Sequence, residues 1–135
     1  MAILGLLLVG CSQPTSAYQG VVRFDDGSPV QSGSIECRSL ADGSRYASRI
    51  ARDGSFSLTD QGGEYRCPPG EYEVVVVQIV LTEDLAADLH THGRTVPRRY
   101  ADYYTSGLRV TNPEVVESGS QSDPPLQITL VGDDQ

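Results

Sequence analysis

Apolar and polar residues alternate through most of the chain from Gly20 to Leu130. In the first such run Val22 and Phe24 flank Arg23, so the apolar side chains share one face and the arginine takes the other. Runs of this period and length are typical of strands with one face in a core. The pattern predicts seven strands, over residues 20–24, 33–39, 45–50, 56–59, 71–81, 108–110 and 126–130.

Turn signals separate these runs. The tripeptide Asp-Gly-Ser occurs at 26–28, 42–44 and 53–55, where aspartate bonds to the following backbone and glycine supplies a positive φ. A Pro-Pro-Gly turn at 68–70 precedes the run 71–81, whose continuously apolar middle is typical of a central strand covered on both sides. Strands at this spacing predict an all-β fold, a seven-stranded β-sandwich.

The period changes after residue 81. A candidate N-cap, two acids and two leucines at helical spacing predict a short helical insertion near 82–92. Pro97 restricts its predecessor, so we expect residues 96–100 to be extended. Residues 112–125 are polar and predict a loop.

The N-terminal residues form an apolar run that is too short to span a bilayer as a helix. The run ends in Leu8-Val9-Gly10-Cys11, which resembles a bacterial lipobox, although no basic residue follows Met1. This resemblance implies export, cleavage before Cys11 and acylation of its thiol. We therefore expect a signal peptide at 1–10, a linker at 11–17, the sandwich at 18–131 and a tail at 132–135.

Two further cysteines, Cys37 and Cys67, form an even pair in an exported chain, which favours a disulfide. Such a bond would close a loop of roughly 30 residues and stabilise the fold by roughly 3–4 kcal/mol in the loop-entropy view. The alternative is a pair of separate buried thiols.

Charge limits the possible partners of the chain. Ten basic residues against eighteen acidic ones give a net charge of −8, and all ten are arginine. Such an acidic chain is a poor nucleic-acid binder, because affinity for phosphate comes from basic patches. At this length a core of ordinary size can form without a cofactor, and we expect none.

Four short motifs follow one another along the predicted strands. They are Asp26-Gly27-Ser28-Pro29-Val30, Asp53-Gly54-Ser55-Phe56, Pro69-Gly70-Glu71-Tyr72-Glu73-Val74, and Pro97 to Tyr100 with Ser106-Gly107-Leu108. In this order they resemble carboxypeptidase regulatory-like, or transthyretin-like, domains, and the last resembles small lipoproteins of planctomycete-type bacteria. The resemblance implies a prealbumin-like (Ig-like) sandwich that acts as a non-catalytic structural, adhesive or ligand-binding module.

His90 and His92 are the sharpest candidates for chemistry, because two nearby imidazoles can hold a transition metal. A third ligand is not evident, so two solvated loop histidines are the simpler interpretation and no metal site is assigned. The chain has no Gly-x-Ser-x-Gly motif, and it lacks the Tyr-Arg-Gly-Ser tail of transthyretin-like hydrolases. We therefore expect no enzymatic activity.

An arginine- and tyrosine-rich cluster is the most interaction-like segment: Arg98, Arg99, Tyr100, Tyr103 and Tyr104. Both residue types are enriched at binding hot spots, and tyrosine rings also stack on sugars. The alternative is that Tyr100 packs on the sandwich edge while the arginines offset the negative charge.

These observations predict an exported, lipid-anchored, non-enzymatic module of the cell envelope. Its role is either structural or the binding of a ligand or partner, such as an envelope protein or a glycan. Ser12 after Cys11 favours the outer membrane, with the domain facing the periplasm or the cell surface. The second hypothesis is a carbohydrate- or metal-binding module that uses residues 82–104, and the third is a hydrolase with an unrecognised site.

Overall fold

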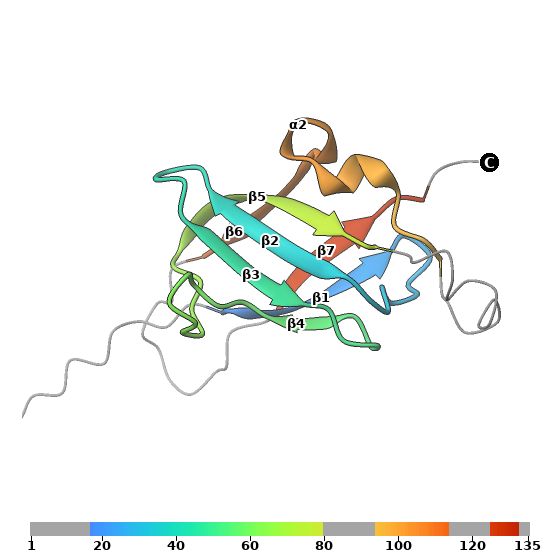
Figure 1. Cartoon of the computed structure of the whole chain (residues 1–135), viewed down its shortest axis with the longest axis horizontal. Helices are drawn as coiled ribbons and strands as arrows, with labels where there is room; N and C mark the ends of the chain where they lie inside the picture. The colour runs from blue at the N-terminus through green and yellow to red at the C-terminus, as the bar shows by residue number, and fades with distance from the viewer. Residues whose placement is uncertain (1–16, 80–93, 114–124, 133–135) are drawn as a thin grey trace, which may run out of the picture.

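The structure is a computed structural model that describes residues 17–79, 94–113 and 125–132. Within these ranges the chain forms seven strands, a 3-10 helix and a short α-helix (Figure 1), which confirms the predicted all-β class. The strands are β1 (Gln19–Phe24), β2 (Ser34–Ser39), β3 (Arg45–Arg49), β4 (Ser55–Ser57), β5 (Gly70–Val77), β6 (Leu108–Asn112) and β7 (Leu126–Leu130). The helices are η1 (Arg98–Ala101) and α2 (Tyr103–Ser106).

Two sheets pack face to face, as Figure 1 shows. The first has the order β4-β1-β7, in which β1 is antiparallel to β4 and parallel to β7. The second has the order β3-β2-β5-β6 and is antiparallel throughout. The described part of the chain is therefore a sandwich of three strands against four.

The core is built from the alternate residues of both sheets. In β1 the side chains of Val22 and Phe24 are buried and that of Arg23 is exposed, as the sequence pattern predicts. The middle of β5 is buried on both faces, because η1 and α2 cover its outer side. The fully buried side chains include Val22, Phe24, Val30, Ile35, Cys37, Leu58, Tyr72, Val74, Val76 and Leu130.

Two predicted elements differ from the structure. Pro97 is extended, with φ −59° and ψ 141°, but residues 98–101 form η1 instead of continuing the extended chain. The Tyr100 amide donates to the Pro97 carbonyl at 3.1 Å, and this turn allows the Tyr100 ring to be buried. β6 continues to Asn112, where the sequence predicted a loop. The predicted helix near 82–92 lies outside the described residues.

The three Asp-Gly-Ser turns share one geometry. In each, an aspartate Oδ1 accepts the amide hydrogen of the serine two residues later, at 2.9–3.0 Å. The intervening glycines have φ between 76° and 88°, a region that residues with a Cβ avoid. Hydrogen bonds from these serines hold the pKa of each carboxyl below its ordinary 3.8, in Asp26, Asp42 and Asp53.

Acid is expected to weaken these turns. Because the folded-state pKa values lie below the unfolded ones, the turns add stability above pH 3.8 that is lost as the pH falls through the folded-state values. A triple Asp-to-Asn variant keeps the bonding oxygen but does not titrate. Its melting temperature should therefore fall less than that of the wild type between about pH 5 and pH 2. An equal fall in melting temperature for the two proteins over this pH range would contradict this account.

Candidate functional site

A row of charged residues crosses the outer surface of the four-stranded sheet. Strand register places Arg38 of β2 opposite Arg45 of β3 on one side and Glu73 of β5 on the other. Glu73 in turn lies opposite Arg109 of β6. Side chains of residues paired in this way share a face of the sheet. The row therefore carries three arginines and one glutamate, on a chain whose net charge is −8.

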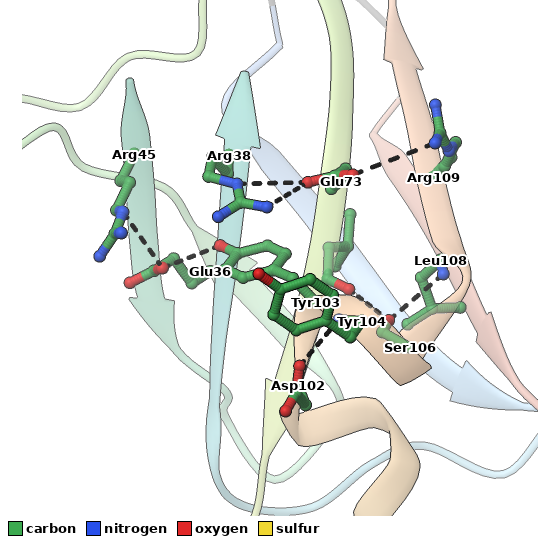
Figure 2. A network of polar contacts seen from close by, with 11 residues as sticks. Glu36, Arg38, Arg45, Glu73, Asp102, Tyr103, Tyr104, Ser106, Leu108 and Arg109 are labelled. Carbon is green, nitrogen blue, oxygen red and sulfur yellow. Dashed lines mark hydrogen bonds and ion pairs between the residues drawn. The ribbon is translucent and has the colours of Figure 1, made fainter. Parts of the chain in front are cut away.

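The carboxylates of this face are each shared between two partners (Figure 2). Glu73 accepts two hydrogen bonds from Arg38, with the shorter N–O distance 2.6 Å, and its other oxygen lies 4.0 Å from the Arg109 guanidinium. Glu36 lies 3.9 Å from Arg45 and accepts the Tyr103 hydroxyl hydrogen at 2.8 Å. Hydrogen bonds thus join Arg38 to Glu73 and Tyr103 to Glu36. Arg45 and Arg109 lie at the edge of ion-pair distance from these carboxylates.

The short helix α2 is held on this sheet by contacts with backbone atoms. Asp102 caps its start by accepting the Tyr104 amide hydrogen at 2.7 Å, and Gly107 ends it with φ 64°. The buried Ser106 hydroxyl donates to the Val74 carbonyl of β5 and accepts the Leu108 amide hydrogen. Ser106, the last residue of α2, therefore bonds the helix to β5.

The two tyrosines of α2 differ in their contacts and exposure. The Arg38 guanidinium carbon lies 4.0 Å from the centre of the Tyr103 ring, a cation–π contact. Burial, and then the bond to Glu36, raise the pKa of the Tyr103 hydroxyl, so it stays protonated. Tyr104, in contrast, is 98% exposed. We call the seven residues Glu36, Arg38, Arg45, Glu73, Tyr103, Tyr104 and Arg109 the arginine–tyrosine face.

The structure divides the cluster that the sequence singled out. Tyr103 and Tyr104 belong to the arginine–tyrosine face, and Arg98 is exposed. Tyr100 is only 4% exposed, and its hydroxyl accepts the Val131 amide hydrogen at 2.8 Å. Arg99 donates to the Val131 carbonyl at 2.6 Å. Arg99 and Tyr100 therefore hold the end of β7, as the structural alternative for Tyr100 predicted.

Sequence reasoning did not find the arginine–glutamate row. Its members lie on four strands, and only their common register brings them together. The alternation predicted that Glu36 and Arg38 point outward, and both are partly exposed on β2. The signal that could have found the row is a charged outward position on each of the four strands, but the pairing of those strands was not predicted.

The predicted disulfide is not formed in the structure, where Cys37 and Cys67 are both buried free thiols. Each sulfur has surroundings that accommodate it as a thiol. Cys37 faces the apolar core from β2, and burial strongly raises its pKa. Burial also raises the pKa of Cys67, partly offset by hydrogen bonds with Tyr72 and Asn112. The alternative of two separate buried thiols is therefore the one that the structure contains.

Neither thiol should react in the folded protein, because the thiolate is the reactive form and both pKa values are raised. With a disulfide-exchange reagent at neutral pH, we expect Cys37 and Cys67 to be modified only after denaturant is added. The matched control is the same titration after reduction and desalting. Release of two extra thiols by reduction would instead show that the bond forms in solution.

Cys11, His90 and His92 lie outside the described residues, so the structure does not place them. Among the residues it does place, no group of three or more His, Cys, Asp or Glu side chains could hold a metal ion. No helix in the described ranges is long and apolar enough to cross a membrane. In comparisons with known proteins, no family model, curated protein or solved structure matched the chain.

Proposed function

We propose that this chain is a non-enzymatic, lipid-anchored sandwich module of the bacterial cell envelope that binds a protein partner through the arginine–tyrosine face. The observation that carries the proposal is Tyr104, 98% exposed on a helix that Ser106 ties to β5. A large ring held in water beside ordered arginines has the composition of a binding hot spot. Arg38 and Tyr103 lose little conformational entropy on binding, because hydrogen bonds to Glu73 and Glu36 already hold them.

The proposed family supports a binding role without catalysis. The motifs that resemble carboxypeptidase regulatory-like domains fall where strands begin and end: after β1, at the start of β4, at the start of β5, and from η1 to β6. We infer membership of that family from this placement together with the two-sheet fold. Anchoring through Cys11, in the outer membrane, is proposed from the lipobox resemblance alone.

The charge of the face favours an acidic partner. Three arginines and two glutamates leave it with a net charge of about +1, whereas the whole chain carries −8. Arg45 and Arg109 lie at the two sides of the row and are more than half exposed. Their guanidinium groups can therefore bind carboxylates of a partner in addition to the glutamates they already contact.

A photo-crosslinking residue at position 104 tests the proposal in intact cells. We expect a discrete protein adduct from position 104 and none from position 65, an exposed tyrosine elsewhere on the sandwich. Purified wild-type domain should compete for the adduct. Absence of any adduct specific to position 104 would overturn the proposed site. An adduct with glycan instead of protein would support the carbohydrate-binding alternative.

Replacing Tyr104 with alanine should separate binding from folding. The side chain is almost fully exposed, so the free energy of unfolding should change by less than about 0.5 kcal/mol. The purified variant should nevertheless lose its ability to compete for the adduct, by at least about tenfold in concentration. Tyr65→Ala is the matched control and should compete like the wild type. Full competition by Tyr104→Ala would show that the ring is not part of the interface.

A further inference from the structure

The chain enters the sandwich at a fixed point. The Asn112 side chain, 2% exposed, donates to the Ala17 carbonyl at 2.9 Å and to the Cys67 carbonyl at 2.7 Å. The Leu58 amide donates to the Tyr18 carbonyl at 2.8 Å. The first described residues are thus bonded to the end of β6 and to the segment that follows β4. The described part of the chain therefore begins at this end of the sandwich.

Exposed apolar side chains lie at the same end. The rings of Tyr18 and Tyr65 are in contact, with centroids 5.6 Å apart, and Tyr65 is 64% exposed. Leu40 is also exposed, and its amide donates to the Glu71 carbonyl at the start of β5. Figure 1 shows this end at the left, where the start of β1, the start of β5 and the end of β6 meet. We call it the anchor end.

The linker between Cys11 and this end has few residues. Six peptide units separate Cys11 from Ala17, and a fully extended chain covers at most about 3.5 Å for each, or roughly 20 Å in total. β7 then leads away from the anchor end, because Leu126 pairs with Gly20 and Leu130 pairs with Phe24. Val131, five residues after Leu126, lies about 17 Å further along the sandwich.

We infer that the anchor end faces the bilayer, with the Tyr18–Tyr65 pair at the level of the lipid headgroups. This inference rests on the proposed acylation of Cys11. Tyrosine is enriched at membrane interfaces because its ring is apolar and its hydroxyl is polar. The exposed apolar residues at the opposite end of the described structure are Ile79 and Val131. The partner that fits the Tyr18–Tyr65 surface is therefore a lipid surface.

The absence of tryptophan from the chain allows a direct test. Two single-tryptophan variants of the full chain are needed, Tyr65→Trp at the anchor end and Val131→Trp at the opposite end. Both positions are at least half exposed, so the folds should be retained, which circular dichroism checks. The acylated proteins are reconstituted in phosphatidylcholine vesicles that contain a dansyl-labelled headgroup lipid. Energy transfer from each tryptophan to this acceptor is then measured.

We expect clear energy transfer from the tryptophan at position 65. Transfer from the tryptophan at position 131 should be much weaker. The same variants with Cys11→Ser should show no transfer, since they lack the anchor. Equal transfer from the two positions, or more from position 131, would overturn the orientation while leaving the anchoring intact. Mass spectrometry of the membrane fraction separates the two claims. An unmodified Cys11 would overturn the proposed anchoring, and the orientation with it.

Discussion

Replacing Gly20 with alanine is expected to destabilise the sandwich by about 2–3 kcal/mol, because the added methyl group has no space. Gly20 lies on β1 between Phe56 of β4 and Leu126 of β7. A Cβ at this position would overlap the Phe56 ring and lie 2.6 Å from the Leu126 carbonyl oxygen. That oxygen belongs to the backbone, so the clash can be relieved only by moving β1 away from β7.

Urea unfolding followed by circular dichroism measures this loss as a lower midpoint at unchanged slope. Gly62→Ala is the matched control. Gly62 lies in an exposed turn, and its Cβ would meet only the end of the Asp60 side chain, at 3.3 Å. Its midpoint should stay close to that of the wild type. Equal stability of the two variants would contradict the close packing of β1 between β4 and β7.

Replacing Asn112 with leucine is expected to cost about 2–4 kcal/mol, since two carbonyl oxygens lose their donor at once. Leucine has a similar size, so the change removes the hydrogen bonds to Ala17 and Cys67 without opening a large cavity. The effect should also be local. The Leu58 amide is bonded to the Tyr18 carbonyl, so the substitution should speed up its hydrogen exchange. Exchange of the Val76 amide, in the middle of β5, should speed up less.

Thr111→Val is the control for this substitution. Thr111 is the exposed neighbour of Asn112 on β6, so the change should alter the unfolding free energy by less than about 0.5 kcal/mol. Retained stability in Asn112→Leu, together with unchanged exchange at Leu58, would contradict the role given to Asn112. A global loss of stability with no selective change at Leu58 would contradict only the local fixation of the N-terminal residues.

The strands could be predicted from the sequence because the signals for them are local. Alternation along β1 and β7 shows which face is buried, and Asp-Gly-Ser marks where the chain reverses. The turn at η1 could not be predicted in this way. Pro97 restricts the residue before it but leaves the following ones free, and the burial of Tyr100 against β7 depends on tertiary contacts.

The candidate site could be predicted only in part. Residue type alone marks Tyr103 and Tyr104 as candidates for binding. The contact of Tyr103 with Arg38 and the exposure of Tyr104 depend on how α2 packs on β5. Arg38 and Glu73 are 35 residues apart in the chain and meet through strand register. Register depends on which strands pair, and the alternation within one strand carries no information about its neighbours.

The parallel pairing of β1 with β7 has a consequence for biogenesis. The first strand of the sandwich is bonded to the last, from Gly20 with Leu126 to Phe24 with Leu130. The four strands of the other sheet all end at or before Asn112 and can assemble earlier, whereas the sheet of β1 is incomplete until residues 126–130 are available. Contacts of such long sequence separation also form slowly. A chain made or delivered from its N-terminus would therefore complete this sheet only once residues 126–130 were available, after all the other described strands.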